Sequence, residues 1–178
     1  MNEKNIGLEI GIFKIIWYSR KVTVLKWYNI LSTGLMMVGT VMFVFFKEPK
    51  FSPNLSSFST VAITGLSFTL ALLIATTKNV FEEEDLKDLA KYDEKYNKFE
   101  FYKLIGPYIY TALLWLILGL VVVLKSTNIF SKILFLNSVL NFWILSIFAM
   151  GLCNLFDLII SNIQDLIKKI ERGLDDEK

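Results

Sequence analysis

Hydrophobic residues in this chain are gathered into four long stretches without any Asp, Glu, Lys or Arg. The stretches are residues 27–46, 58–77, 104–124 and 133–156. About 20 helical residues, at a rise of 1.5 Å each, cross the roughly 30 Å hydrocarbon core of a bilayer. Each stretch has that length or slightly more, so the pattern predicts four transmembrane helices in an all-α polytopic membrane protein.

The polar segments between the four stretches are short. They predict a cytoplasmic interfacial segment over 1–26, outer loops over 47–57 and 125–132, a cytoplasmic helical loop over 78–103 and a cytoplasmic helical tail over 157–178. Neither outer loop is long enough to fold into an external domain.

The distribution of cations predicts the orientation of the chain. Fifteen of the 19 Lys and Arg residues lie in the first 26 residues, the middle loop and the tail, and four lie in the two predicted outer loops. Lys and Arg are retained on the cytoplasmic side of a membrane. We therefore expect both termini and the middle loop to be cytoplasmic.

The amino-acid composition then excludes several classes of functional site. The chain is 54% hydrophobic, contains no His and has one cysteine, Cys153. Catalytic triads with His, His-ligated zinc and His-ligated haem are excluded, and an internal disulfide is impossible. We expect a protein that is not an enzyme, needs no cofactor or metal, contacts membrane lipid and does not bind nucleic acid directly.

The N-terminal segment fits two structures. Apolar residues at alternate positions over 6–12 would suit a strand, whereas Phe13, Ile16, Trp17 and Arg20 suit a helix. Helix or strand stays open for residues 5–16, and the favoured interpretation is an interfacial helix over about 8–18.

An aromatic stripe characterises the middle loop. Apolar residues recur there at intervals of three and four, which predicts an amphipathic helix; they are Leu86, Leu89, Tyr92, Tyr96 and Phe99. The stripe either packs on other cytoplasmic helices of the same chain or forms a docking face for a soluble cytoplasmic protein.

A heptad seam runs out of the fourth stretch into the tail. Its members are Phe156, Ile160, Ile163, Ile167, Ile170 and Leu174, separated by four and three residues in alternation. Isoleucine at both apolar positions of the heptad favours a trimer or tetramer over a dimer. The alternative is packing of the seam within one chain. We expect Gly173 to end this helix.

The predicted spans contain polar residues but no ionisable ones, which argues against an ion-coupled carrier. The polar residues singled out are Thr60, Thr64, Ser67, Asn137 and Asn141. They either form hydrogen bonds between helices or line a water-filled path in an oligomer. Small residues predict close helix contacts at Gly34, Gly39, Gly65, Ala112 and Gly119.

The seventeen lysines against two arginines suggest an AT-rich bacterial or phage genome. The layout of four short-looped spans, both ends inside, a helical middle loop and a helical tail resembles the small membrane subunits of bacterial antiphage defence, such as the Kiwa-type membrane component. This resemblance implies a homo-oligomeric sensor in the bacterial inner membrane that works with a separate soluble effector. Two other classes stay open: a pore-forming effector, and an accessory or immunity protein that binds another membrane protein.

The predicted orientation can be tested by cysteine labelling in a Cys153→Ser background. Lys91→Cys should be protected from a membrane-impermeant maleimide in intact cells, because the middle loop is expected inside. Asn128→Cys should react under the same conditions. Labelling of Lys91→Cys from outside would overturn the orientation.

Overall fold

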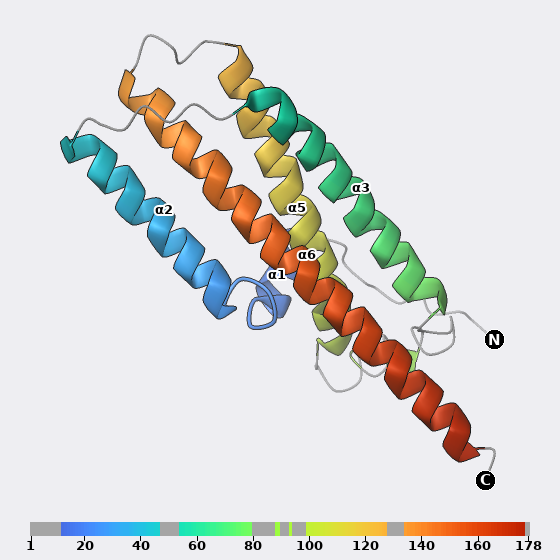
Figure 1. Cartoon of the computed structure of the whole chain (residues 1–178). Helices are drawn as coiled ribbons and strands as arrows, with labels where there is room; N and C mark the ends of the chain where they lie inside the picture. Colours follow the sequence, from blue (N-terminus) through green and yellow to red (C-terminus); the bar gives the residue numbers. More distant parts are fainter. Residues whose placement is uncertain are drawn as a thin grey trace, which may run out of the picture.

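The computed structural model of the chain is all-helical (Figure 1). It describes residues 12–46, 54–79, 88–89, 93, 99–127 and 134–176. Its helices are α1 (Ile12–Ser19), α2 (Trp27–Phe46), α3 (Leu55–Asn79), α5 (Glu100–Ser126) and α6 (Leu134–Asp176). These ranges contain no strand.

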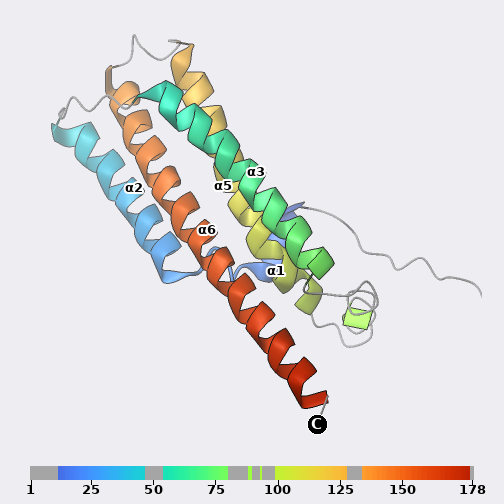
Figure 2. The ribbon, with the colours of Figure 1, turned by 45° about the vertical axis from the view of Figure 1, so that its right-hand side comes forward.

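Among the described residues, three helices are long and apolar enough to cross a membrane. The qualifying segments are Leu55–Thr77, Glu100–Ser126 and Val139–Ile170. Helix α2 covers residues 27–46, the first of the four apolar stretches, but is not among these three. The four long helices run alongside one another in both views (Figures 1 and 2).

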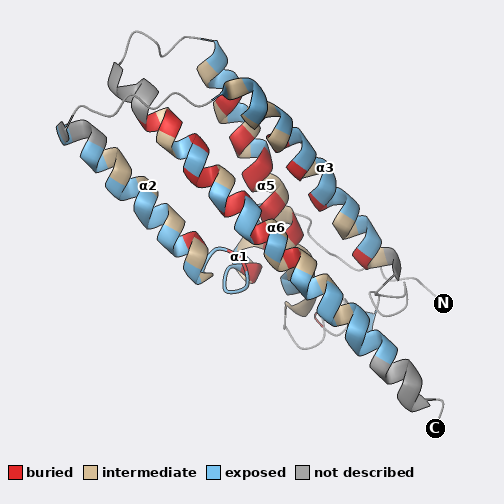
Figure 3. Cartoon of the chain, viewed as in Figure 1, coloured by how far each residue is buried: buried red, intermediate tan, exposed pale blue. Residues whose placement is uncertain are grey.

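Helix α5 lies at the centre of the bundle, where it packs against α1, α3 and α6. Helix α2 lies at the edge and packs mainly against α6. Buried residues accordingly gather on α5 and on one side of α6, while most of α2 and α3 is exposed (Figure 3). In a bilayer, exposed apolar faces of this kind contact lipid rather than water.

Trp115 of α5 occupies the middle of the core and is 1% exposed. A Cβ atom added at Gly65 would lie 2.5 Å from its ring, and one at Gly151 would lie 3.0 Å away. The indole therefore leaves no room for a side chain at position 65 and makes a tight contact with position 151. A Cβ at Gly39 would likewise meet the Phe142 ring at 2.3 Å. The structure confirms the close contacts predicted at Gly65 and Gly39.

Gly34 behaves differently, because a Cβ there would meet nothing within 4 Å. The predicted close helix contact at Gly34 is therefore wrong for contacts inside a single chain. Residue 34 lies on a part of α2 that no neighbouring helix covers.

The start of the described chain is helical, as the favoured interpretation predicts. Helix α1 includes residues 12–19, and residues 5–11 lie outside the described part of the chain. Ser19 docks α1 on α5, where a Cβ at Gly106 would lie 2.2 Å from the Ser19 Cβ. The Tyr18 ring stacks on Phe99 with 3.7 Å between centroids and 9° between planes.

The aromatic stripe of the middle loop falls mostly outside the described residues, which leaves out Leu86, Tyr92 and Tyr96. Leu89 is helical and half-buried.

Phe99 corrects the prediction of one helix through the stripe, because it is the N-cap of α5 and has a non-helical backbone. The Asp93 carboxylate accepts hydrogen bonds from the Glu100 and Phe101 N–H groups at 2.9 and 2.7 Å. These bonds satisfy donors that the first turn of a helix leaves free, so a new helix begins here.

Helix α6 is 43 residues long and continues through Gly173 to Asp176. The prediction that Gly173 ends this helix is therefore wrong. A single glycine costs a helix only about 1 kcal/mol relative to alanine, which weakens the helix without breaking it. The C-terminal part of α6 projects beyond the ends of the other helices (Figures 1 and 2).

Candidate functional site: a polar collar around α6

Hydrogen bonds and an ion pair join the side of α6 that faces the bundle to the neighbouring helices. They lie near the point where α6 extends beyond those helices. We call this set the polar collar. It comprises Asn154, Asp157 and Asn162 of α6, Lys26 and Asn29 at the start of α2, Thr76 of α3 and Tyr108 of α5.

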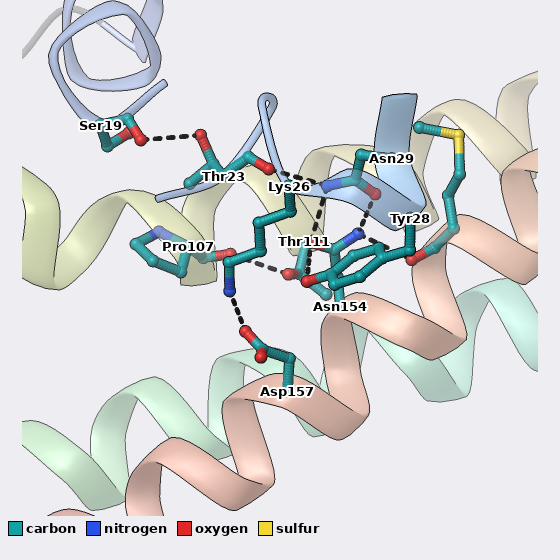
Figure 4. Close-up of polar contacts among 10 residues, drawn as sticks. Ser19, Thr23, Lys26, Tyr28, Asn29, Pro107, Thr111, Asn154 and Asp157 are labelled. Carbon is teal, nitrogen blue, oxygen red and sulfur yellow. Dashed lines mark hydrogen bonds and ion pairs between the residues drawn. The ribbon is translucent and has the colours of Figure 1, made fainter. Parts of the chain in front are cut away.

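The α2 side of the collar is built on a reciprocal pair of amides (Figure 4). The Asn154 Nδ2 donates to the Asn29 Oδ1 at 2.7 Å, and the Asn29 Nδ2 donates to the Asn154 Oδ1 at 3.2 Å. Each Nδ2 also donates to a backbone carbonyl at 2.8 Å, on Met150 and Thr23 respectively. Both side chains are buried. Buried amides satisfied in this way fix one rotation of α6 against α2.

Lys26 forms an ion pair with Asp157 one turn further along α6 (Figure 4). Both side chains are partly exposed, at 22% and 36%. Asp157 is the first charged residue after the apolar stretch 133–156. The pair therefore lies where the sequence of α6 changes from uncharged to charged.

The α3 and α5 side of the collar is a cluster of two hydroxyls and an amide. The Tyr108 hydroxyl donates to the Asn162 Oδ1 at 2.9 Å, and its oxygen lies 2.8 Å from the Thr76 Oγ1. Thr76 also bonds to the Asn162 Oδ1. The buried Nδ2 of Asn162 has no partner among the described residues. One amide of α6 thus joins the two neighbouring helices.

The segment between α1 and α2 is held by its own hydroxyls. The Ser19 hydroxyl donates to the Ile15 carbonyl at 2.7 Å, and the Thr23 hydroxyl donates to the Ser19 carbonyl at 3.0 Å. Both side chains are buried. These bonds place the Thr23 carbonyl where Asn29 reaches it, so α1 is linked to the collar.

The seam lies on the opposite side of α6 from the collar. Its described side chains are between 41% and 66% exposed; they are Phe156, Ile160, Ile163, Ile167 and Ile170. The side chain of Leu174 lies outside the described residues. No described helix covers these five side chains, and the segments that would cover them within one chain, the middle loop and the N-terminal segment, fall mostly outside the described residues. Leu145 and Leu152 extend the exposed apolar face toward the middle of the bundle.

The hydroxyls singled out from the sequence do not join helices. Thr60, Thr64 and Ser67 are exposed on α3, and Thr60 donates to the Ser56 carbonyl of its own helix at 3.1 Å. Asn141 is buried on α6, and the Asn137 side chain lies outside the described residues.

Sequence reasoning missed residues that do join helices, among them Asn29, Thr76, Tyr108, Asn154 and Asn162. An available signal was an amide near the start of the first apolar stretch, Asn29, and another near the end of the fourth, Asn154.

The polar collar itself offers hydrogen bonds and one ion pair among the described residues. They contain no group of three or more His, Cys, Asp or Glu that could hold a metal ion. A pocket of about 180 Å³ between α3 and α5 is lined mainly by apolar side chains, together with Thr69 and Tyr108. Comparison with known proteins adds no assignment, because no family model, curated protein or solved structure matches the chain.

The amide pair can be tested by a double-mutant cycle. Asn154→Leu should lower the free energy of unfolding by about 1–3 kcal/mol, because it leaves the buried Asn29 amide with fewer partners. Asn29→Leu should act similarly. The double variant should lose clearly less than the sum of the two, as measured by thermal unfolding in detergent.

Gln164→Leu is the matched control, since it changes an exposed amide of the same helix. Additive losses from Asn29→Leu and Asn154→Leu would contradict a direct coupling.

Proposed function

We propose that the chain is a non-enzymatic, homo-oligomeric subunit of the bacterial inner membrane that couples an event in the envelope to a cytoplasmic partner. In this proposal it has four spans, including α2, with both termini and the middle loop in the cytoplasm. The single observation that carries it is the continuous helix α6, which passes along the bundle and projects beyond it with an apolar face exposed.

The length of α6 supports the cytoplasmic tail. Its 43 residues span about 64 Å, roughly twice the hydrocarbon thickness of a bilayer. About half of the helix therefore extends outside the hydrocarbon. The ion pair of Lys26 with Asp157 favours a boundary near residue 157, which leaves Ile160, Ile163, Ile167 and Ile170 in water.

A second copy of the chain is the occupant that best fits the seam. Burial of apolar surface contributes about 25 cal/mol per Å², so a row of exposed isoleucines in water favours association. Chains inserted in the same orientation have parallel tails, which align identical seams in register. Isoleucine at alternating seam positions then favours a trimer or tetramer.

The polar collar supports the coupling role. It bonds α6 to α2, α3 and α5 on the side opposite the seam. A displacement of those helices would therefore move or rotate the tail and its seam. The resemblance to antiphage membrane subunits suggests the biological setting of defence against phage.

The middle loop is the proposed docking face for the cytoplasmic partner. The Phe99 ring is already stacked on Tyr18 within the chain. Tyr92 and Tyr96 are therefore the better candidates for partner contact.

A pore-forming effector is the second candidate function. The observation that favours it is the exposure of Thr60, Thr64 and Ser67 on one face of α3. In an oligomer this face could line a water-filled path. An accessory or immunity protein, the third candidate, would be a monomer when its membrane partner is absent.

The oligomer is tested by placing charges in the seam. Ile163→Asp with Ile167→Asp should convert the detergent-solubilised complex to a smaller species, because unpaired charges in an apolar contact are costly. Ser161→Asp with Lys168→Gln changes the net charge by the same amount at exposed positions away from the seam and should leave the mass unchanged. Mass can be measured by light scattering. An unchanged mass for the seam variant would refute the trimer or tetramer.

The partner-binding and pore candidates predict opposite results for two double substitutions. Tyr92→Ala with Tyr96→Ala should abolish partner capture and the phage-defence phenotype, since aromatic residues at interface centres often contribute 2 kcal/mol or more. Thr64→Leu with Ser67→Leu should leave both intact. If the aromatic variant keeps full activity while the hydroxyl variant loses ion leakage from liposomes, the pore replaces the scaffold.

A further inference from the structure

Helix α1 presents an aromatic and basic face away from the bundle. Phe13 and Trp17, one turn apart, are 88% and 63% exposed, and Arg20 and Lys21 are exposed at the end of the helix. Ile15 and Ser19, on the other side, are buried. A face with two large exposed rings beside two cations is costly in water and needs an occupant.

The charge of this segment has one sign. Residues 12–27 contain four Lys and Arg and no Asp or Glu. Lys26 is paired with Asp157 of α6. The Arg20 guanidinium lies 4.3 Å from the centre of the Trp17 ring and donates to the Trp17 carbonyl at 3.2 Å. Guanidinium and indole are thus held together on one surface.

The contacts of α1 with α3 and α5 fix the position of this surface along the bundle. Ser19 contacts Gly106, which lies six residues after the start of α5. Ile12 lines the apolar pocket with Leu70 and Leu73 of α3 and Ile109 of α5. Helix α1 therefore lies against the C-terminal half of α3 and the N-terminal half of α5, two helices that are long and apolar enough to span a membrane.

We propose that the outer face of α1 is a binding surface for anionic phospholipid headgroups. Phe13 and Trp17 enter the boundary between headgroups and acyl chains, and Arg20 and Lys21 contact the phosphates. The inference rests on the membrane orientation in the proposed function, with this end of the bundle at the cytoplasmic leaflet. Charge complementarity identifies the occupant, because cations next to the membrane attract anionic lipid and aromatic rings favour the interfacial layer.

The full-length protein in bilayers can report this contact locally. A fluorophore on Val24→Cys, in a Cys153→Ser background, is quenched by nearby brominated lipid. Brominated phosphatidylglycerol in phosphatidylcholine bilayers should quench it at a lower mole fraction than brominated phosphatidylcholine. Arg20→Gln with Lys21→Gln should reduce this preference about fivefold or more, since each cation near a membrane surface contributes about 1 kcal/mol.

Three controls make the result specific. Lys168→Gln with Lys169→Gln removes the same charge from the tail and should leave the preference intact. Arg20→Lys with Lys21→Arg keeps the charge and should also retain it, which separates loss of charge from misfolding. Ile163→Asp with Ile167→Asp should keep the preference, so failure of the oligomer and failure of the lipid site are distinguishable.

Two outcomes would overturn the proposal. One is equal quenching by the two lipids around the wild-type sequence. The other is an unchanged preference in the Arg20→Gln and Lys21→Gln variant. Either result would show that Arg20 and Lys21 do not bind anionic headgroups.

Discussion

The length of α6 is the constraint on which the rest of the structure depends. A helix of about 64 Å exceeds the hydrocarbon thickness by roughly a factor of two, so its surroundings must change along its length. Its first half lies among apolar helices, with Trp115 and the glycines beside it filling the core. Its second half carries the seam. One continuous helix thus joins the core of the bundle to the seam.

Near the end of the bundle, one face of α6 is polar and the opposite face is apolar. The inner face uses Asn154, Asp157 and Asn162 to bond to the neighbouring helices. The outer face is apolar and exposed from Phe156 to Ile170. Polar bonds between helices are directional and fix an orientation, whereas an apolar seam favours association with any matching seam. This division lets one helix be anchored within its chain and still available to another copy.

Patterns of apolar residues along the chain predicted helices whose formation depends on local sequence. Uncharged apolar stretches identified helices such as α2, and the spacing of isoleucines predicted the long extension of α6. The cap of α5 was missed because Asp93 lies seven residues before Glu100, outside the usual spacing of a capping residue. The collar was missed because the Asn29 and Asn154 amides are 125 positions apart, and only tertiary packing brings them together. Hydrophobic spacing shows that a face is apolar, but whether it is covered within the chain depends on where its neighbours end.

The most direct test of the central claim is disulfide crosslinking of the seam in native membranes. In a Cys153→Ser background, Ile167→Cys should form a crosslinked dimer on mild oxidation, because a parallel seam brings identical positions near the roughly 4.4–6.8 Å Cα separation of a disulfide. Gln164→Cys, exposed but outside the seam, should crosslink far less. Equal crosslinking at the two positions, or none at Ile167→Cys, would contradict an association of copies through α6.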